Sequence, residues 1–145
     1  MEYINKLNTC SNENTPYFSL DGVECLCKCI NVYDGDTITV ILKPDGFPDF
    51  FKFKIRLDGI DAPEIRTKND VEKQNAILVR DFLRSMILDK IINIKCGKYD
   101  KYGRILATIK LQDSDQTIND ILIEKKYAIK YDGGTRTPFE SGYAE

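Results

Sequence analysis

The segment NVYDGDTITVIL, residues 31–42, decides how the fold begins, because two acids and a glycine interrupt a run of strand-like alternation. On either side of this DGD motif (Asp34–Asp36), residues 24–33 and 36–43 alternate between apolar and polar side chains, as half-buried β-strands do. Asp and Gly favour tight turns. Taken alone, the motif is best interpreted as the turn of a β-hairpin, and a chemical role for one of its acids is the alternative.

Further strands and two helices follow this hairpin. Alternation recurs over residues 51–57, 90–96 and 104–111. Residues 69–88 change to a helical period, and residues 116–128 predict a shorter helix. The order is three strands, a helix, two strands and a helix. We therefore expect a mainly β, α+β domain: a five-stranded OB-fold barrel with two or so helices packed against it.

The apolar faces of the two helices can be predicted from their spacing. Asn69 or Asp70 is the expected N-cap of the longer helix. Its predicted apolar face consists of Val71, Leu78, Phe82 and Met86, joined by Val79 and Leu83. The shorter helix is predicted to bury Ile118, Ile121 and Leu122.

The length of 145 residues indicates one domain with a real core, which we expect over residues 23–145. Residues 1–22 are polar and rich in Asn, and they predict a loose extension or an added edge element. The tail from Tyr131 onward is predicted to be loop-like. Neither a signal peptide nor an apolar run of roughly 20 residues is seen, so we expect an intracellular protein without membrane contact.

Composition limits the chemistry. The net charge is −2, so any binding to a polyanion must come from a local patch. The chain has no histidine, which excludes Ser-His and Cys-His triads and histidine-ligated metals. An enzyme built from this sequence must use carboxylates, Lys, Tyr, Arg, Cys or a metal held by oxygen atoms.

Three of the five cysteines, Cys25, Cys27 and Cys29, alternate and therefore face one side of a strand. We interpret them as reduced core or interface residues. A metal–thiolate cluster is the alternative, and neither a histidine nor a paired CxxC motif supports it.

A second cluster of charges, RLDGIDAPEIR, occupies residues 56–66 at the exit of a predicted strand. It can be a solvated loop of mixed charge. Pro63 stiffens the chain between Asp61 and Glu64, however, and Arg56 lies at the strand end. These residues also suit an oxygen-only cation site beside an anion-binding group.

A third cluster, KYDKYGRILATI, occupies residues 98–109. A hairpin turn at Tyr102-Gly103 accounts for part of it. Lys98, Lys101 and Arg104, interleaved with tyrosines, also suit a nucleotide, because cations bind phosphate and aromatic rings contact a base or sugar.

Taken together and in this order, DGDT (34–37), R-x4-D-x-P-E (56–64) and DKYGR-x-LA (100–107) resemble the staphylococcal nuclease (thermonuclease) family. The resemblance covers about residues 31–131. It implies a five-stranded OB barrel and hydrolysis of phosphodiester bonds in DNA and RNA with one Ca²⁺. The expected substrates are single-stranded or locally open, and the expected products end in 3′-phosphate.

The resemblance also implies roles for individual residues. Asp36, Asp61 and the main-chain carbonyl of Ala62 resemble the Ca²⁺ ligands, and Glu64 resembles the proposed general base. Arg56 and Arg104 resemble the arginines that bind the phosphate. Residues expected at a neighbouring phosphate or at the base are Lys101, Tyr102 and Tyr131.

Two departures from the family's pattern are evident. The sequence pI is about 5.3, low beside the basic secreted members, so we expect modest and strongly salt-dependent affinity for long DNA. The family's C-terminal third helix is expected to be absent. The alternative function is a catalytically inactive nuclease-like module that binds nucleic acid or protein. Retention of all five acids and arginines favours the active enzyme.

Overall fold

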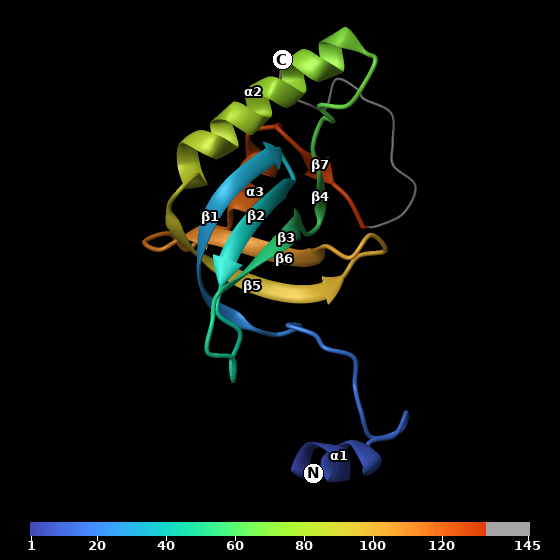
Figure 1. Cartoon of the computed structure of the whole chain (residues 1–145). Coiled ribbons are helices and arrows are strands. Elements are labelled where there is room, and N and C mark those ends of the chain that lie inside the picture. Colours follow the sequence, from blue (N-terminus) through green and yellow to red (C-terminus); the bar gives the residue numbers. More distant parts are fainter. Residues whose placement is uncertain (133–145) are drawn as a thin grey trace.

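A computed structural model describes residues 1–132 of the chain. Five strands close into a barrel in the order β1-β2-β3-β6-β5, and the β3–β6 pair is parallel (Figure 1). This mixed barrel confirms the predicted OB-fold. The barrel strands are β1 (Glu24–Asp34), β2 (Thr37–Leu42), β3 (Phe51–Leu57), β5 (Ile91–Tyr99) and β6 (Ile105–Leu111).

Two helices cover the barrel. The longer helix, α2 (Asp70–Ile87), packs on β1, and the shorter helix, α3 (Ile118–Glu124), packs on β6 (Figure 1). Asn69 caps α2 as predicted, since its side-chain oxygen accepts a hydrogen bond from the Glu72 N–H at 3.0 Å. No helix in the described part of the chain has the length and apolar content needed to cross a bilayer.

The predicted apolar face of α2 needs a correction. Its buried residues are Ala76, Val79, Leu83 and Ile87, while Val71 and Leu78 are exposed. The apolar residues of this helix form a stripe wider than the contact with the barrel, so spacing alone does not show which edge is buried. In α3, Ile118 and Leu122 are buried as predicted, and the third fully buried position is Asn119 instead of Ile121.

Three short elements were not expected from the sequence. Helix α1 (Glu2–Asn8) forms within the N-terminal extension, buries no residue and lies away from the barrel (Figure 1). Strands β4 (Ile60–Asp61) and β7 (Ile129–Lys130) pair as a separate two-stranded sheet. Two-residue strands are too short for a periodic pattern. The predicted loop-like tail is described only at residues 131–132, and residues 133–145 lie outside the described residues.

The barrel interior is filled by alternate residues of its strands. Ile38, Val40 and Leu42 of β2 are almost fully buried, in line with the predicted alternation. Cys27 and Cys29 belong to this core, and no cysteine forms a disulfide within residues 1–132. Burial raises the pKa of Cys27 to about 12, with neighbouring thiols adding to the effect. These thiols are therefore packing residues.

The DGD motif forms the predicted hairpin turn. Asp34 of β1 pairs with Thr37 of β2, which leaves Gly35 and Asp36 as the turn residues. A Cβ atom at Gly35 would lie 2.5 Å from Val79 Cγ1 and 2.8 Å from Ala62 Cβ. Glycine is required here because α2 and the chain after β4 both approach the turn closely.

Candidate active site

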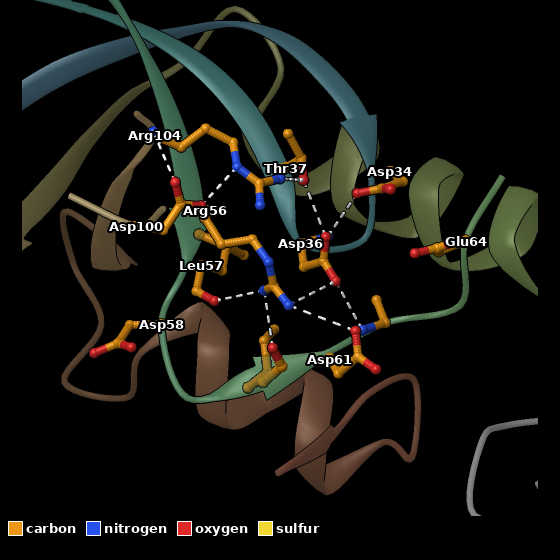
Figure 2. A network of polar contacts seen from close by, with 12 residues as sticks. Asp34, Asp36, Thr37, Arg56, Leu57, Asp58, Asp61, Glu64, Asp100 and Arg104 are labelled. Atoms are coloured by element: carbon orange, nitrogen blue, oxygen red, sulfur yellow. Dashed lines mark hydrogen bonds and ion pairs between the residues drawn. The ribbon is translucent and has the colours of Figure 1, made fainter. Parts of the chain in front are cut away.

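One large cavity, of about 1050 Å³, opens where the β1–β2 turn, the chain after β3 and the β5–β6 loop meet. It brings together residues of all three sequence clusters, which lie far apart along the chain (Figure 2). The predicted site residues that line it are Asp36, Arg56, Asp61, Glu64, Lys101, Tyr102, Arg104 and Tyr131.

Asp36 is buried at the wall of this cavity. Its Oδ1 accepts a hydrogen bond from the Thr37 hydroxyl at 3.0 Å, and its Oδ2 accepts one from the Ala62 backbone N–H at 2.9 Å. The two bonds fix the carboxylate in one orientation. Ala62 thus contacts Asp36 through its N–H group, and the predicted role of its carbonyl stays a prediction.

Asp34 contacts the backbone of Asp36. Its Oδ1 accepts a hydrogen bond from the Asp36 backbone N–H at 3.1 Å. Burial, followed by the nearby negative charge of Asp36, raises the pKa of the Asp34 carboxyl well above its usual range. Asp34 is thus positioned to order the turn.

Arg56 lies at the centre of the site (Figure 2). Its Nη1 donates to the carbonyls of Leu57 and Ile60 at 2.9 and 2.8 Å, which locks the guanidinium onto the chain between β3 and β4. Its Nη2 lies 3.5 Å from Asp36 Oδ2 and 3.5 Å from Asp61 Oδ1. Its Nε makes no hydrogen bond to any described residue and remains able to donate to a ligand.

Arg104 faces the same cavity from the β5–β6 loop. Its Nε donates to Asp100 Oδ2 at 2.7 Å, and its Nη1 lies 3.4 Å from the Thr37 hydroxyl. Its Nη2 has no protein acceptor within residues 1–132. The guanidinium is therefore oriented by two side chains while one amino group stays open to the cavity (Figure 2).

Asp100 is the anchor of this loop. Its Oδ1 accepts hydrogen bonds from the backbone N–H groups of Tyr102 and Arg104 at 2.8 and 2.9 Å. Burial acts to raise the pKa of Asp100, but these bonds and the Arg104 guanidinium outweigh it and lower that pKa below its usual value. The ionised carboxylate is thus the form that the folded loop favours.

The remaining predicted residues lie around the rim. Glu64 is exposed on the loop between β4 and α2, where it lines the cavity (Figure 2). The exposed Tyr102 ring lies 5.3 Å from Lys101 Nζ and 5.5 Å from the Arg104 guanidinium carbon. The centroid of the Tyr131 ring lies 5.8 Å from the guanidinium carbon of Arg56. All these side chains border one space.

Two structural partners were not predicted as site residues, namely Thr37 and Asp100. Thr37 links Asp36 to Arg104, two residues that belong to different clusters. Asp100 is the acid within DKYGR, and its position four residues before Arg104 is a sequence signal that could have predicted their pairing. The link through Thr37 joins positions 67 residues apart, which no local pattern predicts.

The donor set suits a hard cation. Asp36 Oδ2 and Asp61 Oδ1 each lie 3.5 Å from Arg56 Nη2, so the guanidinium lies between the two buried carboxylates. Carboxylate oxygens are the ligands that Ca²⁺ prefers. Within residues 1–132, no group of three or more His, Cys, Asp or Glu side chains is arranged to hold a metal ion. Any such site must therefore complete its coordination with backbone oxygen, water or substrate.

Comparison with known families places this geometry in context. The family model described as "Staphylococcal nuclease homologue" matches residues 54–143, which include Arg56, Asp61, Glu64 and Arg104. The chain belongs to the staphylococcal nuclease family. The match begins within β3, so Asp36 lies outside it. Its hydrogen bond to Ala62 and its contact with Arg56 connect Asp36 to the matched part of the staphylococcal nuclease domain.

Curated relatives are distant. An uncharacterized endonuclease of Escherichia coli is 29% identical, with 72% of this chain and 60% of the relative aligned. An uncharacterized protein of Methanocaldococcus jannaschii is also 29% identical, with 72% of this chain and 58% of the relative aligned. The chain thus spans about six-tenths of the length of these relatives.

Proposed function

We propose that this chain is a Ca²⁺-dependent nuclease that hydrolyses phosphodiester bonds of DNA and RNA and leaves 3′-phosphate ends. The observation that carries the proposal is the meeting of Arg56, Arg104 and Glu64 with two buried carboxylates around one cavity. An E. coli relative named as an endonuclease supports the same class of reaction.

The two arginines supply the anion-binding part of the reaction. A phosphodiester is an anion, and its five-coordinate transition state concentrates more negative charge on the phosphoryl oxygens. Arg104 offers Nη2 and Arg56 offers Nε to those oxygens, from guanidiniums already held by other contacts. Donors fixed in advance stabilise developing charge without reorganisation, which is the largest contribution in many active sites.

Glu64 is the carboxylate best placed to act as a base. Asp36 and Asp61 are both buried and lie beside Arg56, whereas Glu64 is exposed at the rim and can reach water. Without histidine, a carboxylate is the natural acceptor for the proton of the attacking water. Water then forms the new P–O bond, the bond to the 5′ oxygen breaks, and that oxygen takes up a proton.

Asp36 and Asp61, with the Ala62 carbonyl, are the residues that would hold Ca²⁺. When bound, the ion supplies positive charge that polarises the phosphoryl group. The protein's own contribution is the orientation of Asp36, which the Thr37 hydroxyl and the Ala62 N–H fix.

The rival function is an inactive nuclease-like module that binds nucleic acid or protein. A module of that kind has no need for an exposed carboxylate on the same cavity as two oriented arginines. Cleavage and metal binding by single variants separate the two functions.

Glu64→Gln is the first variant to examine. We expect it to lower kcat by about 10²-fold or more, since it removes the proton acceptor, while Ca²⁺ affinity measured by calorimetry stays near that of the wild type. Asp36→Ala is the comparison, because it should lower both quantities. A Glu64→Gln variant that loses Ca²⁺ affinity to the same extent would make Glu64 a ligand, and unchanged cleavage would remove it from the mechanism.

A further inference from the structure

The outer face of β3 carries a line of cations that starts at the cavity. Lys52, Lys54 and Arg56 alternate along the strand and share a face, while Ile55 and Leu57 between and beyond them point into the core. Both lysines are exposed. They lie on the same strand as Arg56, so the positive charge continues outward from the active site.

The charges of the two lysines are unpaired in the part of the chain that the structure describes, since neither Lys52 nor Lys54 forms an ion pair there. Their neighbours across the β2–β3 ladder, Ile41 and Thr39, are uncharged. Two acids, Asp45 and Asp49, lie in the loop that precedes β3, so the line of cations ends at the start of the strand. Two uncompensated lysines in a chain of net charge −2 form a local patch for an anion.

The spacing of the patch suits a polynucleotide backbone. Alternate residues of a strand are about 6.8 Å apart, of the same order as the separation of successive phosphates in an extended single strand. Phe50, which is 67% exposed, directly precedes the strand and presents a ring at the far end of the line. Exposed rings stack on unpaired bases, whereas bases in a duplex are already stacked.

We propose that the outer face of β3 is a track for single-stranded nucleic acid, on which Lys54 and then Lys52 bind successive phosphates beyond the bond at the active site. The track rests on the proposed nuclease function for its direction, because Arg56 links it to the cavity. It gives a chain of low pI a local means of holding a long substrate.

The test measures binding without cleavage. A labelled single-stranded oligonucleotide of about 12 nucleotides is titrated in chelator, over a range of salt, into the wild type and into Lys52→Ala/Lys54→Ala. Two lost phosphate contacts should reduce the slope of log K against log salt by about 1.4 and weaken binding on the order of tenfold at low salt. The control Lys95→Ala/Lys110→Ala removes the same charge from β5 and β6 and should keep the wild-type slope.

The outcomes separate the track from the nuclease proposal, because cleavage by the wild type in Ca²⁺ is scored independently. Cleavage together with an unchanged slope in Lys52→Ala/Lys54→Ala would overturn the track and leave the nuclease standing. A reduced slope without any cleavage by the wild type would support binding on β3 and contradict the nuclease proposal. An equal reduction of the slope in Lys95→Ala/Lys110→Ala would overturn the assignment of the track to β3. An equal reduction for a duplex of the same length would overturn the preference for a single strand.

Discussion

At the scale of single residues, the site is a network of polar contacts that joins Asp100, Arg104, Asp36 and Arg56. Asp100 holds Arg104, Thr37 connects Arg104 to Asp36, and Asp36 contacts Arg56. Charge-assisted hydrogen bonds of 2.7 Å, such as that between Asp100 and Arg104, are the strong members of such networks. Removal of one of these side chains should therefore displace the side chain that it orients, while the barrel stays folded.

Arg104→Ala should lower kcat by at least ~10²-fold, the cost of one donor that acts on the transition state. A matched control is Arg80→Ala, since Arg80 also pairs with an acid, Asp81, and its side chain is 24% exposed against 26% for Arg104. Cleavage rate and thermal unfolding are measured for both. Equal rates for the two variants would remove Arg104 from the reaction.

Asp100 should make the folded state sensitive to acid. Its pKa is lowered in the folded protein, so its stabilising contribution is fully present above the ordinary value of 3.8 and is lost as pH falls through the folded value. Asp100→Asn should flatten the fall in unfolding free energy below about pH 4, measured by urea titration. Identical acid profiles in the variant and the wild type would contradict this role.

At the scale of elements, the site depends on how closely the β1–β2 turn approaches α2. Gly35 permits that approach, because any Cβ would collide with Val79 and Ala62. Ala62 also donates to Asp36, so a displaced turn would move a proposed metal ligand. The glycine of the DGD motif is thus a packing requirement as well as a turn residue.

Gly35→Ala should destabilise the fold by about 1–3 kcal/mol through overpacking. Removing the Val79 methyl groups relieves one of the two collisions, so the cost should be smaller in a Val79→Ala background. The four unfolding free energies form a double-mutant cycle. The same cost in both backgrounds would show that Val79 is not what requires glycine.

The barrel strands and α2 could be predicted from sequence because each is long enough to show its period. The β4–β7 pair and α1 could not, since their pattern is too short, and the buried edge of α2 depends on the barrel beneath it. The residues of the site were predicted through the family resemblance. Their cross-links through Thr37 were not, because they join distant positions.

At the scale of the whole molecule, an acidic chain is proposed to act on a polyanion. The net charge of −2 gives no general attraction to nucleic acid, so the proposed affinity must come from local cations, for which we propose the cavity arginines and the β3 lysines. A few local contacts of this kind are screened by salt, and affinity should depend on ionic strength. This differs from binding by a uniformly basic surface.

The central claim is that this cavity hydrolyses phosphodiester bonds with Ca²⁺. The most direct measurement incubates the purified protein with single-stranded DNA, in Ca²⁺ or in chelator, and identifies the product ends. The account predicts cleavage in Ca²⁺ only, with products that end in 3′-phosphate. Equal cleavage in chelator, or no cleavage in Ca²⁺, would contradict it.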